Sequence, residues 1–94
     1  MMKIEHEERD DRGAFFVDDG GKHVAELTYK LEDDDVMNID HTETDEKFRG
    51  EGIAQDLVKT AVEHARKNKL TVRATCPYAK KLIDKTPEFQ DVLA

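Results

Sequence analysis

The period of the hydrophobic pattern changes once along this 94-residue chain, and the change limits the folds open to it. Through residue 43, apolar and polar residues largely alternate, as in strands with one packed and one solvated face. From Ile53 onward, apolar residues recur every three or four positions, as in an amphipathic helix. The change falls in the segment KFRGEGIAQDL, residues 47–57, so the pattern favours an α/β (α+β) fold built around a strand-to-helix turn.

Four strands are expected before this turn. Residues 2–6 predict a short edge strand, and residues 13–31 predict a β-hairpin whose turn contains Gly20 and Gly21, because glycine supplies the positive φ of a tight turn. Residues 36–43 predict the fourth strand. Unless a bulge intervenes, one side of that strand carries Met37, Ile39, His41 and Glu43.

The second half is expected to add a helix, a strand and a short helix. The long helix is predicted over residues 53–68 and the strand over residues 70–76, where Pro77 stops it. Residues 78–84 predict the short helix and residues 86–94 a last helical turn. The strand–helix–strand unit at 36–76 predicts one parallel pair beside an antiparallel sheet, and the whole chain, residues 1–94, is expected to form one domain.

Composition narrows the possible partners and the compartment. The formal charge of −7 argues against a nucleic-acid binder, fits an amine-bearing partner, and also fits a surface that only keeps the protein soluble. The single cysteine, Cys76, has no partner for an internal disulfide, and the charged N-terminal segment lacks a signal-peptide core. We therefore expect a cytoplasmic protein without a membrane span, and its small apolar inventory predicts a monomer.

The glycines at the start of the long helix allow two interpretations. A helix N-terminus presents unpaired N–H groups and the positive end of the helix dipole, so glycine there can admit an anion such as a phosphate, with Arg49 beside it. Alternatively, Gly50 and Gly52 only relieve strain in a tight turn.

The same segment resembles the coenzyme-A pyrophosphate loop of the GCN5-related N-acetyltransferases, Q/R-x-x-G-x-G/A. The motif falls on Lys47, Gly50 and Gly52, with lysine in place of the usual glutamine or arginine. A miniature branch of that superfamily has a His-Thr-Glu segment before the loop and a cysteine after the next strand. Here these features are DHTETD at 40–45 and TCPY at 75–78.

This resemblance implies a curved, mixed, mostly antiparallel sheet with one main helix and a short C-terminal helix. The two helices that larger relatives carry after their first strand are absent. It also implies an acetyl-CoA-dependent N-acetyltransferase, with an acceptor amine of unknown identity on a small molecule or a protein. The pantetheine arm would lie between the strands around 38–43 and 70–76. The implied cofactor-binding residues are Lys47, Phe48, Arg49, Gly50, Glu51, Gly52, Ile53 and Ala54. A non-catalytic coenzyme-A-binding module and a protein-interaction domain remain as alternatives.

Four side chains are candidates for the chemistry. His41 suits a general base, or is a partly buried strand residue, and Glu43 is a second base or an ordinary loop charge. Cys76 is an acyl-accepting nucleophile or a small packed residue. Tyr78 is a proton donor to the departing thiolate or an amphipathic ring on a helix face.

No metal site is expected from the sequence. The four histidines, His6, His23, His41 and His64, lie in different elements without ligand-pair spacing. The acidic runs EERDD and EDDDV lack the pattern of a calcium loop and predict solvated turns.

Overall fold

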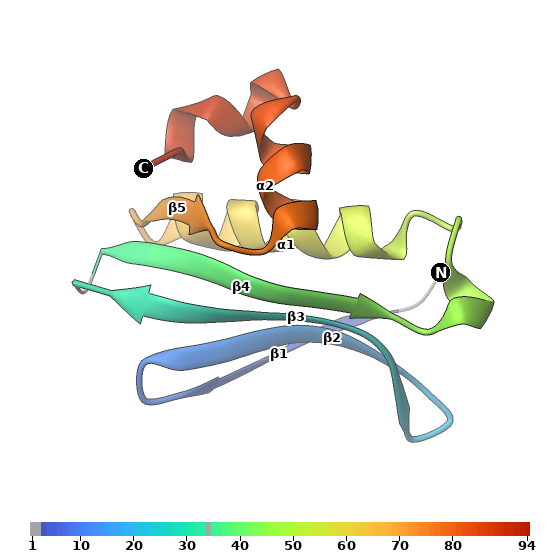
Figure 1. The fold of residues 1–94 in the computed structure, drawn as a ribbon. Coiled ribbons are helices and arrows are strands. Elements are labelled where there is room, and N and C mark those ends of the chain that lie inside the picture. The colour runs from blue at the N-terminus through green and yellow to red at the C-terminus, as the bar shows by residue number, and fades with distance from the viewer. Residues whose placement is uncertain (1–2, 34) are drawn as a thin grey trace.

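The computed structural model describes residues 3–33 and 35–94, which form a five-stranded sheet with the helices on one side of it (Figure 1). The strands are β1 Ile4–Arg9, β2 Arg12–Asp19, β3 Lys22–Glu32, β4 Val36–Thr44 and β5 Thr71–Ala74. The helices are η1 Glu46–Phe48, α1 Ile53–Lys67, α2 Pro77–Asp84 and η2 Pro87–Val92, where η marks a 3₁₀ helix. This order confirms the predicted succession of strands and helices, although η1 was not expected and the predicted start of the first strand at residue 2 lies outside the described residues.

The strands are ordered β1-β2-β3-β4-β5, antiparallel except for the parallel β4–β5 pair. This arrangement confirms the predicted mixed, mostly antiparallel sheet. Gly20 and Gly21, with φ of 62° and 86°, form the predicted hairpin turn between β2 and β3. A turn at Asp10 and Asp11 joins β1 directly to β2, so no helices stand between them, as the resemblance implied.

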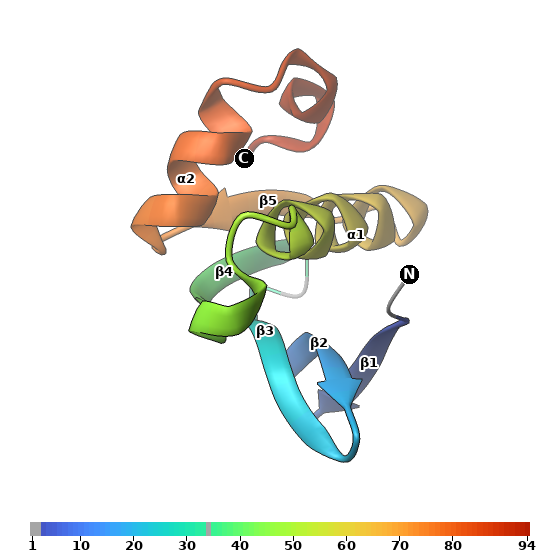
Figure 2. The ribbon, with the colours of Figure 1, turned by 90° about the vertical axis from the view of Figure 1, so that its right-hand side faces the viewer.

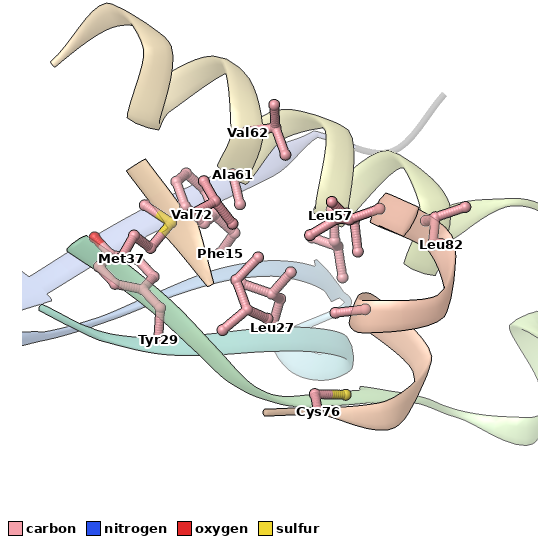
Figure 3. Close-up of a cluster of buried hydrophobic side chains, with 14 of the residues drawn as sticks. Phe15, Leu27, Tyr29, Met37, Leu57, Ala61, Val62, Val72, Cys76 and Leu82 are labelled. Atoms are coloured by element: carbon pink, nitrogen blue, oxygen red, sulfur yellow. The ribbon is translucent and has the colours of Figure 1, made fainter. Parts of the chain in front are cut away.

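The hydrophobic core lies between the sheet and the helices (Figure 3). From Leu57 to Ala65 the apolar stripe of α1 is fully buried and packs over the inner face of the strands, as its spacing predicted, whereas Ile53 and Ala54 are partly buried. Tyr29 is the largest fully buried side chain, and its ring lies over Gly13 in the neighbouring strand. A Cβ built on Gly13 would come within 2.2 Å of Tyr29 Cζ, so this position requires glycine.

A bulge in β4 corrects the predicted faces of that strand. Ile39 pairs with Tyr29 and His41 with Thr28, which leaves Asp40 as the extra residue. The inward face therefore passes from Ile39 to Thr42, whereas His41 lies on the opposite face. The common side for Met37, Ile39, His41 and Glu43 was predicted only in the absence of a bulge. Because the extra residue reverses the alternation, His41 and Glu43 lie on the side opposite to Met37 and Ile39.

The bulged Asp40 is held by one side chain from β3 and one from β2. Thr28 Oγ1 donates a hydrogen bond of 2.6 Å to Asp40 Oδ1, and Arg12 Nη2 lies 3.1 Å from Oδ2. These contacts fix the bend at which β4 changes face. Within residues 3–33 and 35–94, no helix is long and apolar enough to cross a membrane.

Candidate functional site

The two parallel strands separate in the middle of β4. Their pairing runs from Val36 beside Thr71 to Ile39 beside Ala74. There the carbonyl oxygen of Ile39 accepts hydrogen bonds from the backbone N–H groups of Thr75, at 3.0 Å, and Cys76, at 3.2 Å. Beyond this point β4 continues to Thr44 while the other chain turns into α2, so the edge of β4 is released from β5 (Figure 2).

The segment after β4 leads into α1 through two residues in the left-handed region. Gly50 has φ of 88° and Gly52 has φ of 78°. Gly52 is the N-cap of α1 and offers no side chain, so the N–H groups of the first turn receive no side-chain cap. A Cβ at either glycine would meet no atom within 4 Å. Both glycines are therefore required by their backbone conformation, and the open helix start is a consequence of that conformation.

A pocket of about 620 Å³ lies between this helix start and the released edge of β4. Six of the predicted cofactor-binding residues line it, namely Phe48, Arg49, Gly50, Gly52, Ile53 and Ala54. Lys47 and Glu51 are not among the lining residues. Three residues that sequence reasoning missed complete the wall, namely Thr42, Thr44 and Gln55. The bulge turns the two threonines toward the pocket, and no local sequence signal reveals that bulge.

Local hydrogen bonds hold the loop that carries Arg49. The Asp45 carboxylate accepts the backbone N–H of Lys47 at 3.1 Å and caps η1. Arg49 Nε lies 3.4 Å from the carbonyl oxygen of Thr44. This contact anchors the guanidinium group against the end of β4, on the wall of the pocket.

Cys76 lies directly behind that wall. Its side chain is buried at the margin of the core, next to β4 (Figure 3), and its Sγ is 3.4 Å from Thr42 Oγ1. Burial opposes ionisation of the thiol. Hydrogen bonds from Thr42 and from the backbone N–H groups of Ala79 and Tyr78 outweigh that effect and hold the pKa of Cys76 below its ordinary value. The thiol is therefore buried, as the packed alternative expected, with its thiolate form favoured; its role as an acyl-accepting nucleophile stays a prediction.

Tyr78 lies on the wall of the pocket itself, in the first turn of α2. It is 44% exposed, and burial together with the charge of ionised Cys76 raises its pKa. The phenol therefore stays protonated at neutral pH and retains a proton to donate.

His41 and Glu43 lie on the outer face of β4. The side chains are 55% and 73% exposed, and His41 Nε2 is 3.5 Å from Glu43 Oε2. His41 is thus not the partly buried strand residue considered as an alternative. Glu43 and Tyr78 are among the residues that line the pocket, and His41 is not. Cys76 lies behind the lining residue Thr42. Their catalytic roles stay predictions.

Comparisons with known proteins agree on one family. The family model described as GCN5-related N-acetyl-transferase matches residues 14–92. Protein NATD1 of Bos taurus is 32% identical over 87 residues, covering 92% of this chain and 75% of its own length. The solution NMR structure of a GCN5-like protein from Staphylococcus aureus is 36% identical, with a TM-score of 0.76, and the match covers 100% of this chain and 91% of that one.

More distant structures share the fold alone. The ribosomal-protein-S18-alanine N-acetyltransferase of Escherichia coli is 13% identical, with a TM-score of 0.67 and coverage of 82% of this chain and 52% of its own. An aminoglycoside acetyltransferase solved with sisomicin is 14% identical, with a TM-score of 0.66 and coverage of 84% and 59%.

Proposed function

The chain belongs to the GCN5-related N-acetyltransferase family, and from this premise we propose that it transfers an acetyl group from acetyl-CoA to an amine. The observation that carries the proposal is the pocket bounded by the uncapped start of α1 and by the edge of β4 released from β5. Under this proposal, residues 1–94 act as one acetyl-CoA-binding unit.

The pyrophosphate of the cofactor is proposed to bind at the start of α1. Backbone N–H groups of the first turn donate to its oxygens, and the helix dipole favours its negative charge. Arg49, on the pocket wall, adds a charge-assisted hydrogen bond. Lys47 is exposed and lies off the lining, so we assign it at most a long-range attraction, which departs from its place in the family motif.

The pantetheine arm is proposed to extend along β4. A strand edge without a partner presents N–H and C=O groups at the spacing of an extended amide chain, and pantetheine is such a chain. Beyond Ile39, β4 offers this edge on the side where β5 has turned away. Thr42 and Thr44 lie on the pocket wall along that stretch.

In the proposed reaction, the neutral amine nitrogen attacks the thioester carbonyl carbon, and the C–S bond breaks as the new C–N bond becomes an amide. The proton lost by the nitrogen passes to Glu43 or His41, directly or through water. The proton that the coenzyme-A thiolate gains comes from Tyr78, whose raised pKa keeps it protonated beforehand. The product pair is an N-acetyl amide and free coenzyme A.

Cys76 offers a second route to the same products. Its lowered pKa favours the thiolate, which can take the acetyl group first and pass it to the amine. Its position behind Thr42 requires that side chain to move aside for the thioester to reach Sγ. Intact mass after rapid quenching separates the routes, because only the two-step route gives an acetyl adduct that Cys76→Ser abolishes.

The acceptor is proposed to be an amine on a small molecule or a protein, and the net charge of −7 favours a cationic one. Loss of thioester absorbance from acetyl-CoA, followed with a panel of polyamines, aminoglycosides and lysine peptides, tests the proposal. Turnover with one class supports it. Binding of acetyl-CoA without turnover would identify a non-catalytic coenzyme-A-binding module, and absence of binding would favour a protein-interaction domain.

A further inference from the structure

A second group of functional side chains lies away from the proposed acetyl-CoA pocket, where β1 meets α1. His6 and Glu8 are two residues apart in β1 and therefore share one face of the strand. His64 projects from α1 toward the same place, with its ring 4.6 Å from the ring of His6. One oxygen of Glu8, Oε1, lies 3.5 Å from His6 Nε2 and 3.6 Å from His64 Nε2.

From this geometry we propose that His6, Glu8 and His64 form a binding site for a divalent transition metal of the Zn²⁺ class. Their ligand atoms all lie within 4.8 Å of one another. A tetrahedral ion with bonds of about 2.0–2.1 Å separates its ligand atoms by roughly 3.3 Å, so both distances to Glu8 already fit within a few tenths of an ångström. Two imidazoles and one carboxylate form a ligand set that zinc sites use, with the fourth position left for water.

The two rings are held in place before any ion binds. The His6 ring stacks on Phe15, with centroids 4.1 Å apart and an interplanar angle of 10°. The His64 ring meets both His6 and Phe15 edge-on. The side chains of His6 and His64 are only 27% and 24% exposed, whereas Glu8 is 51% exposed and free to adjust. The site thus combines two packed imidazole rings with one more exposed carboxylate.

The hydrogen-bond partner of His6 would compete with a bound ion. The Tyr29 hydroxyl lies 2.7 Å from His6 Nε2 and can donate to it, so the metal and Tyr29 compete for the same lone pair on that nitrogen.

A metal ion at this site would link β1 to α1. Among the described residues, β1 is an edge strand that pairs with β2. An ion held by His6 and Glu8 on one side and by His64 on the other would fasten this edge strand to α1. Sequence reasoning expected no metal here because the histidines are 58 positions apart by numbering, and only the fold brings them together.

The test uses the full chain with Cys76→Ser, which removes the thiol as a competing ligand. Co²⁺ and Zn²⁺ are titrated by absorbance and calorimetry, with Mg²⁺ as the control ion. We expect one equivalent of Co²⁺ or Zn²⁺ to bind, with affinity at least tenfold weaker in Glu8→Gln and in His64→Gln. Glu8 is half exposed, so its variant separates loss of a ligand from loss of the fold. Matched controls are His23→Gln and His41→Gln, because each of these histidines also lies beside one carboxylate, Asp18 and Glu43 respectively.

Two further outcomes decide the assignment. Tyr29→Phe is expected to tighten metal binding roughly two- to tenfold, because it removes a hydrogen bond that competes for His6 Nε2. Zn²⁺ is also expected to raise Tm and slow amide exchange in β1. Equal affinity in Glu8→Gln, His64→Gln and the parent, or no stoichiometric binding of either ion, would overturn the proposal.

Discussion

Thr42 Oγ1 lies 3.4 Å from Cys76 Sγ, across the gap that opens where β4 and β5 stop pairing. The contact exists because the bulge at Asp40 turns Thr42 to the inner face, while the hydrogen bond from Cys76 N–H to Ile39 fixes the other strand. It connects the wall of the pocket to the buried thiol behind it.

This contact predicts a change in the thiol when the threonine hydroxyl is removed. In Thr42→Val the pKa of Cys76 should rise, because the largest of the hydrogen bonds that oppose the effect of burial is lost. Thiolate absorbance as a function of pH measures the titration, with Cys76→Ser as the blank. An unchanged midpoint would show that the backbone N–H groups of Ala79, Tyr78 and Thr42 are sufficient to keep the pKa of Cys76 low.

The lowered pKa of Cys76 also predicts a pH dependence of stability. The unfolded chain binds more protons than the native one between the lowered pKa and the ordinary thiol value of about 8.5. The contribution of Cys76 to the free energy of unfolding is therefore fully present at pH values above the ordinary thiol pKa. It is lost as the pH falls through the lowered pKa of the folded protein.

Urea unfolding of the parent and of Cys76→Ser at several pH values from 6 to 9 isolates this contribution. The free energy of unfolding of the parent, relative to that of Cys76→Ser, should increase as pH rises. Since the other titrating groups are the same in both chains, a difference that stays constant with pH would contradict the lowered pKa.

The glycine loop can be tested with a pair of variants that carry equal backbone strain. Gly50 has φ of 88° and Gly21 in the β2–β3 turn has φ of 86°, and a Cβ at either position meets open space. Alanine should cost about 1–2 kcal/mol of stability at both positions. Only Gly50→Ala should weaken acetyl-CoA binding, by at least tenfold, because only Gly50 lines the pocket.

Calorimetric titration of acetyl-CoA into both variants makes the comparison. Similar affinities in Gly50→Ala, Gly21→Ala and the parent would assign Gly50 a purely conformational role. Valine at Gly52 is a poorer probe, since its β-branched side chain adds strain at φ of 78° to any loss of binding.

Gly13 is predicted to be the glycine least tolerant of substitution. Gly13→Ala should lower the free energy of unfolding by roughly 1–3 kcal/mol, because the new Cβ would overlap the ring of Tyr29. Urea unfolding measures the loss. In a Tyr29→Leu background the added alanine should cost much less, and an equal cost in both backgrounds would show that the ring is not the cause.

The sequence was sufficient for the order of elements, the hairpin turn at Gly20 and Gly21, and the parallel pairing around α1. Each of these depends on a local signal, either a periodicity or a turn residue. The family resemblance also named most of the loop residues that line the pocket.

Other features depend on contacts that no local pattern records. The bulge at Asp40 is stabilised by Thr28 from β3 and Arg12 from β2, so the face of His41 was not readable from alternation. The approach of His6 to His64 likewise follows from the packing of β1 beside α1. The positive φ of Gly50 and Gly52 is seen only in the backbone geometry, and anion binding by the same loop stays a prediction.

Binding of acetyl-CoA in the pocket is tested by an amide NMR titration with acetyl-CoA, with ATP as the phosphate-bearing control. We expect saturable shifts centred on residues 49–54 and extending along β4 to Thr42 and to Cys76. Shifts with ATP should be much weaker, because it lacks the pantetheine arm. If acetyl-CoA leaves these amides unmoved, or moves them no more than ATP does, the pocket is not an acetyl-CoA site and the proposed transferase function is contradicted.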